Sequence, residues 1–452
     1  MKYHFIAIGG SVMHNLALAL KSQGNTVTGS DDEIFEPSLS RLKHAGILPE
    51  DQGWDENRID KSIDIVILGM HAKEDNPELI KAKELDLKVL SFPEFLYEHS
   101  KNKTRLVIGG SHGKTTITSM IMHVLKEKNI DFDYIVGAMI EGFDIMARLS
   151  DNSELMIFEG DEYLTSPLDR RPKFHLYKPH VALLSGVAWD HFNVFPTFEN
   201  YVEQFRIFIS MIQPGGSLVF YNGDKILKEL SLDLPEDVSS LPYYVPRHHI
   251  KDGITYLVFE NDSIPLQVFG DHNLANLEGA RLVLNQIGIS DEDFYESIKS
   301  FTGAARRLQK IYQADTYDVY LDFAHSPSKL EATVNAVKNQ YPDRKLVACM
   351  ELHTFSSLNK DFISNYAGSM NPADIAIVYY NPHTVKLKRL ESIDEEYIKE
   401  AFAQDNLIIF TEASKLKEFL LSQNWNKTNL LMMSSGNFDN LDINKIAEEM
   451  NV

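Results

Sequence analysis

The sequence predicts an α/β protein with mostly parallel sheets, divided into three domains. Short apolar runs alternate with helical patterns along the chain, which is the arrangement that βαβ units produce. Two of these runs end in glycines directly before a helix, at Gly9 and at Gly109. At about 150 residues per domain, the 452 residues correspond to three domains, which we expect at 1–103, 104–310 and 311–452.

Composition and charge exclude several classes of partner. The chain has 44 Lys and Arg against 65 Asp and Glu, and its net charge of −21 repels nucleic acid. No apolar run reaches the length of a membrane span, and the one at the N-terminus is too short for a secretion signal. The single cysteine, Cys349, allows neither an internal disulfide nor a cysteine-built zinc site. These features predict a cytoplasmic protein without nucleic-acid or membrane partners, and they leave its oligomeric state open.

The first domain begins with a strand, a glycine turn and a helix. Residues 3–8 are apolar, Gly9 and Gly10 follow, and a helical pattern then ends at Gly24. Further strands complete the βαβ pattern, and we expect them at 25–29, 64–69 and 88–92.

The glycine turn at residues 9–10 is compatible with two roles. The dinucleotide-binding pattern G-x-G-x-x-G is absent, because Ala7 and Val12 stand where glycines would be. A purely structural turn and a diphosphate site therefore both remain open. Ser30 and Asp31 follow about 20 residues later, where a ribose-binding acid is found in such domains.

The second domain begins with the most specific local pattern, LVIGGSHGKTT, which runs from a strand straight into a helix at 114–127. Glycines let backbone N–H groups turn toward a phosphate, and the helix N-terminus adds partial positive charge. Lys114 would reach the β- and γ-phosphates, and Thr115 would bind Mg²⁺. The loop is shorter than the usual G-x-x-x-x-G-K-T, since Ile108 occupies the first glycine position. The predicted phosphate loop comprises Gly110, Ser111, His112, Gly113, Lys114, Thr115 and Thr116.

Acidic residues follow two further strands of this domain. Glu159, Asp161 and Glu162, at the end of the strand 155–160, could supply one or two oxygens to a hard cation or belong to a solvated acidic turn. Asp190 and His191 follow the strand 180–187. The histidine could be a metal ligand or a packing residue, and the preference of Mg²⁺ for oxygen ligands favours the packing role. The positive cluster Arg170, Arg171 and Lys173 could pair with an anionic substrate or lie on a solvated loop.

The third domain repeats the strand-and-helix alternation. Arg306 and Arg307, near the expected domain junction, could neutralise phosphoryl charge or form interdomain salt bridges. Asp322 ends a strand and could accept from a ribose hydroxyl or cap the next helix. The strands that we expect are at 318–324, 346–352, 373–380, 407–410 and 429–436.

Together, and in this order, the motifs resemble the Mur ligase family, the ATP-dependent amide-forming enzymes of peptidoglycan assembly. The resemblance spans essentially the whole chain. It is carried by GSD after the first glycine turn and by GSHGKTT, EGDE, WDH, GDHNLANLEGA, AARRL and DFAHSP.

The resemblance implies a UDP-sugar-binding Rossmann-like domain, a central ATPase domain and a C-terminal Rossmann-like domain. It implies that Lys114 and Thr115 serve the ATP phosphates and Mg²⁺, and that Glu159 and His191 contact metal. Arg306 would reach the γ-phosphate, with Asp322 and His325 near the nucleoside and His272, Asn273 and Asn276 by the adenine. The implied substrate-binding residues are Gly9, Gly10, Ser11, Val12, Met13, Ser30, Asp31 and His71.

Within the family, EGDEYLTSPLDRRPKFHLYKPHV and DFAHSP look most like the branch that recycles murein peptides. This implies a ligase that joins UDP-N-acetylmuramate to L-alanyl-γ-D-glutamyl-meso-diaminopimelate through an acyl phosphate. From their place after the strand 346–352, we also expect His353–Phe355 to face the amine. The alternatives are a ligase of de novo synthesis that uses L-alanine and a non-catalytic nucleotide-binding relative. The chain departs from the family pattern at Met13–Asn15, Ser185–Gly186, Ala188, Asn193 and Ser326.

Overall fold

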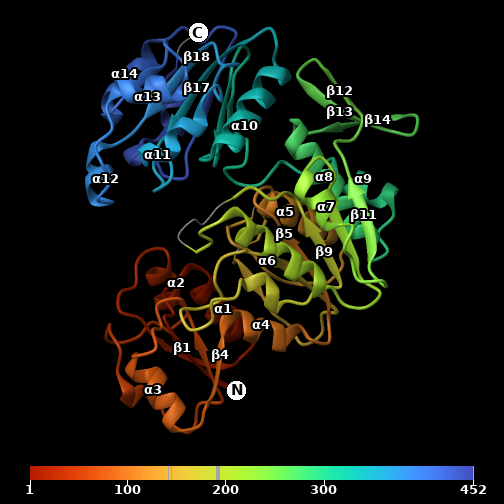
Figure 1. Ribbon diagram of the computed structural model, residues 1–452, viewed down its shortest axis with the longest axis vertical. Helices are drawn as coiled ribbons and strands as arrows, with labels where there is room; N and C mark the ends of the chain where they lie inside the picture. Colours follow the sequence, from red (N-terminus) through yellow and green to blue (C-terminus); the bar gives the residue numbers. More distant parts are fainter. Residues whose placement is uncertain (141, 144, 190–193, 451–452) are drawn as a thin grey trace. The chain divides into compact units, whose positions relative to one another are not determined.

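The computed structural model describes residues 1–140, 142–143, 145–189 and 194–450 (Figure 1). The chain forms two compact units. The first comprises Met1–Tyr244 and Ala275–Ile298, and the second comprises Val245–Leu274 and Lys299–Val452. The predicted α/β class with mostly parallel sheets is confirmed in both units.

The N-terminal sheet is fully parallel and has the strand order β2-β1-β3-β4. Because β2 and β3 lie on opposite sides of β1, the strand order reverses there, which is where open α/β sheets bind ligands. Apolar side chains bury both faces, with Phe5 and Ile67 on one and Ile6 and Val66 on the other. The elements are β1 (Lys2–Ile6), α1 (Ser11–Ser22), β2 (Thr26–Ser30), α2 (Ser38–His44), β3 (Ile65–Leu68), α3 (Pro77–Glu84), β4 (Lys88–Ser91) and α4 (Phe92–Ser100).

The central sheet of the first unit has the order β11-β10-β9-β5-β8-β6-β7, in which only β7 is antiparallel among the described strands. The strand and helix predicted around the phosphate loop are confirmed as β5 and α5. The strands are β5 (Thr104–Gly109), β6 (Asp133–Ile135), β7 (Ala147–Arg148), β8 (Leu155–Glu159), β9 (Val181–Leu184), β10 (Ser217–Tyr221) and β11 (Ser239–Tyr243). The helices are α5 (Lys114–Glu127), α6 (Phe198–Ser210), α7 (Lys225–Leu230), α8 (Asp271–Asn285) and α9 (Asp291–Ile298), and the boundary between the units falls within α8.

The second unit contains a small antiparallel sheet and a larger, mostly parallel one. The small sheet consists of β12 (His248–Lys251), β13 (Ile254–Phe259) and β14 (Asp262–Leu266). It contacts α10 (Pro327–Gln340), where the Thr255 hydroxyl donates to Gln340 Oε1 at 2.9 Å. This sheet was not predicted from the sequence.

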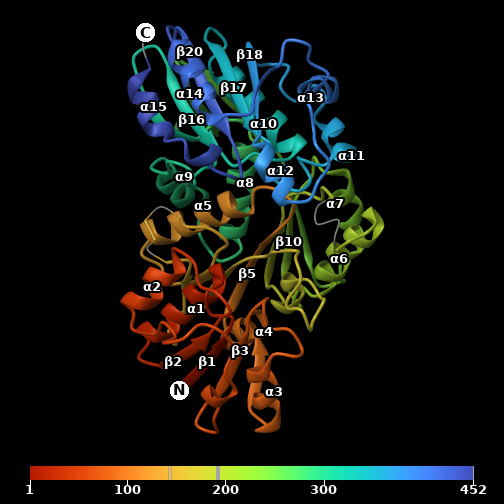
Figure 2. The same ribbon diagram turned by 90° about the vertical axis from the view of Figure 1, so that its left-hand side faces the viewer.

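The larger sheet of the second unit has the order β15-β16-β20-β17-β18-β19, with β15 antiparallel. Helices α10 and α13 cover one face, and α14 and α15 cover the other (Figure 2). The strands are β15 (Gln309–Gln313), β16 (Asp318–Asp322), β17 (Lys345–Glu351), β18 (Ile375–Tyr379), β19 (Ile408–Phe410) and β20 (Thr428–Met433). The remaining helices are α11 (Lys360–Ile363), α12 (Pro382–Leu387), α13 (Glu395–Phe402), α14 (Ala413–Ser422) and α15 (Ile443–Glu449).

Candidate functional site

The phosphate loop joins β5 to α5 through two glycines with left-handed backbone angles. Gly110 has φ +114° and Gly113 has φ +75°, a region that a residue with a Cβ rarely adopts. A Cβ on Gly113 would also collide with the side-chain oxygen of Asn276 on α8. The loop therefore needs glycine at 113 for both its conformation and its packing.

Lys114, the first residue of α5, is held by two oxygen atoms. Its Nζ donates to the Gly110 carbonyl at 2.6 Å and to Glu162 Oε2 at 2.7 Å. Burial lowers the pKa of Lys114, but the carboxylates of Glu162 and Asp161 outweigh this effect, so the pKa is raised overall. The lysine is thus a fixed positive charge beside the loop.

Thr115 and Glu159 lie together, as expected for a cation site. The Thr115 hydroxyl donates to Glu159 Oε1 at 2.8 Å, and Glu159 Oε2 accepts from the Gly137 backbone N–H at 2.9 Å. A hydroxyl and a carboxylate are oxygen ligands of the kind that Mg²⁺ prefers, so this pair fits the ion. His191, the third predicted metal ligand, and Asn193 lie outside the described residues.

The loop after β9 holds the phosphate loop in place through hydrogen bonds. Ser111 N–H donates to the Gly186 carbonyl at 3.0 Å, and Ser111 Oγ accepts from the Ala188 backbone N–H at 2.9 Å. The Ser185 hydroxyl donates to the His112 carbonyl, while the His112 ring lies 2.8 Å from Ser111 Oγ. The departures from the family pattern at 185, 186 and 188 are therefore direct neighbours of the phosphate loop.

Two members of the positive cluster after Glu159, Arg171 and Lys173, pair with nearby acids. Arg171 Nε donates to both carboxylate oxygens of Asp169, at 3.0 Å each. Lys173 lies 2.5 Å from Asp161. Burial raises the pKa of Asp161, but Lys173 and Lys114 lower it more, to about 2. Arg171 and Lys173 thus bind residues of this chain.

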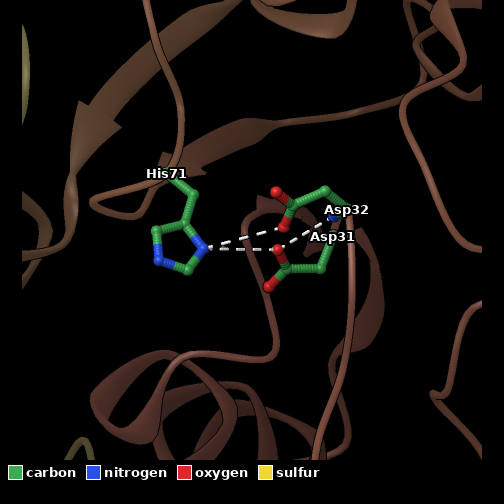
Figure 3. A group of neighbouring side chains, drawn as sticks. All are labelled: Asp31, Asp32 and His71. Atoms are coloured by element: carbon green, nitrogen blue, oxygen red, sulfur yellow. Dashed lines mark hydrogen bonds and ion pairs between the residues drawn. The ribbon is translucent and has the colours of Figure 1, made fainter. Parts of the chain in front are cut away.

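The N-terminal glycine turn is held by Asp31, which is 1% exposed. Gly9 N–H donates to Asp31 Oδ2 at 2.7 Å, and His71 Nδ1 lies 3.6 Å from Asp31 Oδ1 and 3.8 Å from Asp32 Oδ1 (Figure 3). Burial, together with Asp32, raises the pKa of Asp31 to about 6. The structure thus brings together the ends of β1 and β2 and the loop after β3, as the strand order requires.

The other residues predicted to bind substrate differ in their accessibility. Ser30 is buried, and its hydroxyl donates to Glu78, while Met13 packs into the core. Gly10 and Val12 are partly exposed, and Ser11 is exposed at the start of α1. The backbone and Ser11 are therefore the accessible groups of this turn.

Arg306, Asp322 and His325 lie in the second unit. Arg306 Nη2 donates to the Ser434 carbonyl at 3.0 Å and to the Gly436 carbonyl at 2.6 Å. Asp322 accepts from the Leu308 and Ala324 backbone N–H groups at 2.5 and 2.6 Å. His325 Nδ1 lies 2.8 Å from the Phe323 carbonyl. These contacts fix a loop at the carboxyl end of β16.

His272, Asn273 and Asn276 occupy the first turns of α8. Burial lowers the pKa of His272 to about 4, so its ring is neutral at pH 7. Asn273 donates to the Phe269 carbonyl at 3.0 Å. A cavity of about 570 Å³ is lined by His272, His248, Asp271, Asn335 and Gln340, among others. This cavity was not predicted from the sequence, because its lining joins the start of α8 to the small sheet and to α10, which are far apart in the chain.

Glu162 and Asp161 were also not predicted as partners of Lys114 and Lys173. Both belong to the EGDE motif, which was predicted to supply oxygens to a cation or to form a solvated acidic turn, but not to pair with lysines. Lys114 lies 48 residues before Glu162 in the chain, and only the pairing of β5 with β8 brings the two side chains together.

The fold and the phosphate loop define an α/β protein built to bind a nucleotide phosphate. The sequence matches "Mur ligase family, catalytic domain" over residues 2–104, "Mur ligase middle domain" over 108–284 and "Mur ligase, glutamate ligase domain" over 306–436. The chain belongs to the Mur ligase family and is an ATP-dependent amide ligase.

Two relatives and one solved structure illustrate the likeness. A UDP-N-acetylmuramate–L-alanine ligase of Caldicellulosiruptor saccharolyticus is 32% identical over 83% of each chain. A UDP-N-acetylmuramate–L-alanyl-γ-D-glutamyl-meso-2,6-diaminoheptandioate ligase of Haemophilus influenzae is 28% identical over 96% of each chain. The crystal structure of a murein peptide ligase from Psychrobacter arcticus superposes with a TM-score of 0.63 and 22% identity, over 100% of this chain and 99% of that one. None of the described helices has the length and hydropathy needed to cross a membrane.

Proposed function

We propose that this enzyme joins UDP-N-acetylmuramate to the tripeptide L-alanyl-γ-D-glutamyl-meso-diaminopimelate, as in peptidoglycan recycling. The observation that carries the choice of amine is the extent of similarity. The Haemophilus relative, whose name specifies this peptide, matches 96% of both chains, against 83% for the L-alanine ligase of Caldicellulosiruptor. Residues 1–103 are proposed to bind the UDP-sugar, 104–310 to bind ATP, and 311–452 to complete the site.

The reaction needs ATP because a carboxylate oxygen is a poor leaving group. The lactyl carboxylate of UDP-N-acetylmuramate attacks the γ-phosphorus, the bond to ADP breaks, and an acyl phosphate forms. The peptide amine then attacks the acyl carbon, loses a proton and expels phosphate, which leaves an amide.

Five side chains are proposed to stabilise the phosphoryl transfer. Lys114 and Arg306 place positive charge beside the transferring group. Thr115 and Glu159, with His191, would hold Mg²⁺, which supplies further positive charge at the phosphates. The proximity of Lys114 Nζ to the Gly110 carbonyl, at 2.6 Å, supports its role at the phosphate loop.

The nucleoside and the UDP-sugar are assigned to two further groups of residues. Asp322, His325, His272, Asn273 and Asn276 are proposed to lie by the ribose and adenine of ATP. The backbone of the turn at Gly9–Met13, with Ser30, Asp31 and His71, is proposed to bind the UDP-sugar. The contact of Asp31 with the Gly9 N–H, at 2.7 Å, supports this second assignment.

The second candidate is an L-alanine ligase, which the higher identity of the Caldicellulosiruptor relative, 32% against 28%, favours. Phosphate release from ATP and UDP-N-acetylmuramate, measured with the tripeptide, with L-alanine and with no amine, separates the two. We expect the tripeptide to give the largest kcat/KM. A preference for L-alanine would overturn the proposal, and no release with any amine would indicate a non-catalytic relative.

A further inference from the structure

Three loops meet at the carboxyl edge of the large sheet of the second unit. In parallel register, β17 pairs with β18 on one side and with β20 on the other, so the segments after these strands lie at one edge. They are Leu352–Phe355, Tyr380 with α12, and Ser434–Asn440. Figure 1 shows α12 and α11 at the same end of the sheet. This edge also holds Arg306, through the Ser434 and Gly436 carbonyls.

Two acidic residues, Glu351 and Asp439, are held in place by hydrogen bonds at this edge, and we call them its floor. Glu351, 3% exposed, accepts from the Phe438 backbone N–H at 2.9 Å and from the Ser434 hydroxyl. Asp439 accepts from the Tyr379 hydroxyl at 2.6 Å. Phe438, Asp439 and Asn440 all have left-handed φ values, +49°, +52° and +63°, which only a well-fixed loop maintains.

The exposed residues around the floor, on α12 and on the loop after β17, are basic and apolar instead. Lys388 Nζ lies 4.3 Å from the centre of the Phe355 ring, which links α12 to the loop after β17. Phe355 is 59% exposed and Leu387 69%. Within the described part of the chain, no carboxylate lies within 4.0 Å of the charged nitrogens of Lys386, Lys388 or Arg389. The nearest acid along the chain, Glu391, contacts Lys360 instead, at 3.6 Å.

We propose that Lys386, Lys388 and Arg389, with Phe355, form a carboxylate-binding subsite for the amine substrate, which we call the α12 rim. Three cations lie within four residues of one another in a chain of net charge −21, and none of them pairs with a carboxylate of the described residues, so they complement a substrate rich in carboxylates. L-Alanine has a single carboxylate, directly beside its amine. The tripeptide has further carboxylates many bonds from its amine, so it reaches a rim while its amine lies at the reacting edge.

The α12 rim therefore determines specificity for a peptide over a free amino acid. This inference rests on the proposed function, because it needs an amine substrate. The α12 rim binds the carboxylates of the peptide and takes no part in the phosphoryl transfer.

The test measures KM for the tripeptide in the double variant Lys388→Ala/Arg389→Ala of the full-length enzyme. We expect KM to rise about tenfold or more, since two charge-assisted contacts are lost. Salt screens the attraction between the exposed cations and the carboxylates of the tripeptide. The KM of the wild-type enzyme should therefore rise with ionic strength, and this dependence should be much weaker in the double variant. The single variant Lys388→Arg keeps the positive charge, so its KM for the tripeptide should stay close to that of the wild type.

The matched control is Lys417→Ala on α14, which removes one charge from a surface pair with Glu449 and keeps the wild-type KM. An unchanged KM and salt dependence in the double variant, with an active wild-type enzyme, would overturn the inference alone. A wild-type enzyme that releases phosphate only with L-alanine would overturn the proposed peptide and the rim together.

Discussion

At the scale of single residues, we expect Lys114 to contribute both to stability and to the proposed chemistry. Its ammonium group lies 2.7 Å from Glu162 Oε2, and the Glu162 side chain is 2% exposed. Removing one partner of a buried ion pair leaves the other charge in a poor environment, which costs more than the pair itself contributes. The Tyr201 hydroxyl donates to Glu162 Oε1 at 3.3 Å, but a hydrogen bond from a neutral group does not replace the lost positive charge.

Lys114→Met should therefore lower the free energy of unfolding by about 3 kcal/mol. The double variant Lys114→Met/Glu162→Gln should be more stable than this single variant, because the glutamine carries no charge and still accepts a hydrogen bond. Urea unfolding of the wild type, both single variants and the double variant measures the coupling. Additive effects would show that the pair is not energetically linked. Ligation should fall by about 10²-fold or more in every variant without Lys114.

Asp31 should make stability depend on pH. Its pKa is raised by burial from 3.8 to about 6, so the folded state holds this proton more tightly than the unfolded chain. The stabilisation is complete below about pH 4 and is lost as the pH rises to about 6. Relative to Asp31→Asn, which does not titrate, the wild type should lose about 1–2 kcal/mol between pH 4 and 7.

The urea midpoint of both proteins across this pH range measures the difference. Asp60→Asn is the control, because hydrogen bonds from Ser62 lower the pKa of the exposed Asp60. Its effect should have the opposite sign, with the wild type gaining stability as the pH rises. A pH-independent difference between wild type and Asp31→Asn would contradict the raised pKa.

At the scale of elements, the phosphate loop depends on glycine more strongly than an ordinary turn does. Gly24, after α1, has φ +83° with no atom within 4 Å of a Cβ, whereas a Cβ on Gly113 meets Asn276. Gly24→Ala should cost about 1 kcal/mol of stability, from backbone strain alone. Gly113→Ala should cost about 2–4 kcal/mol and abolish binding of an ATP analogue.

Thermal unfolding and calorimetric titration measure these two effects. The double variant Gly113→Ala/Asn276→Ala removes the collision and keeps the strained φ, so it should recover part of the lost stability. If it is no more stable than Gly113→Ala, the collision with Asn276 is not the cause.

The sequence predicted those elements whose signal is local. The strand β5, its glycines and α5 follow one another, so apolar pattern, turn and helix start all agree within residues 104–127. Glu162, Ser185 and Asn276 could not be assigned as neighbours of the loop, because they lie in the loops after β8 and β9 and in α8. The small sheet β12–β14 was missed because many of its side chains are exposed on short strands, which weakens the alternating apolar pattern.

At the scale of the whole molecule, the proposed ATP contacts are divided between the two units. Lys114 belongs to the first unit and Arg306 to the second. A ligand that both residues bind should couple the units, as domain closure does in many enzymes that exclude water from a reactive intermediate.

Small-angle scattering should therefore show a lower radius of gyration with UDP-N-acetylmuramate and a non-hydrolysable ATP analogue than without them. In Arg306→Ala, the ligands should bind to the first unit with less compaction or none, while Lys417→Ala should behave as the wild type does. Equal compaction in Arg306→Ala would remove this arginine from the closing contact.

The interleaving of the two units along the chain constrains how such enzymes can be recombined. The backbone passes between the units after Tyr244, after Leu274 and after Ile298. A chimaera that exchanges only the residues after 298 would separate the small sheet from α10, although Gln340 donates to the Gly253 carbonyl at 2.8 Å. Exchange of acceptor specificity between relatives should therefore transplant 245–274 together with the C-terminal segment, as a discontinuous module.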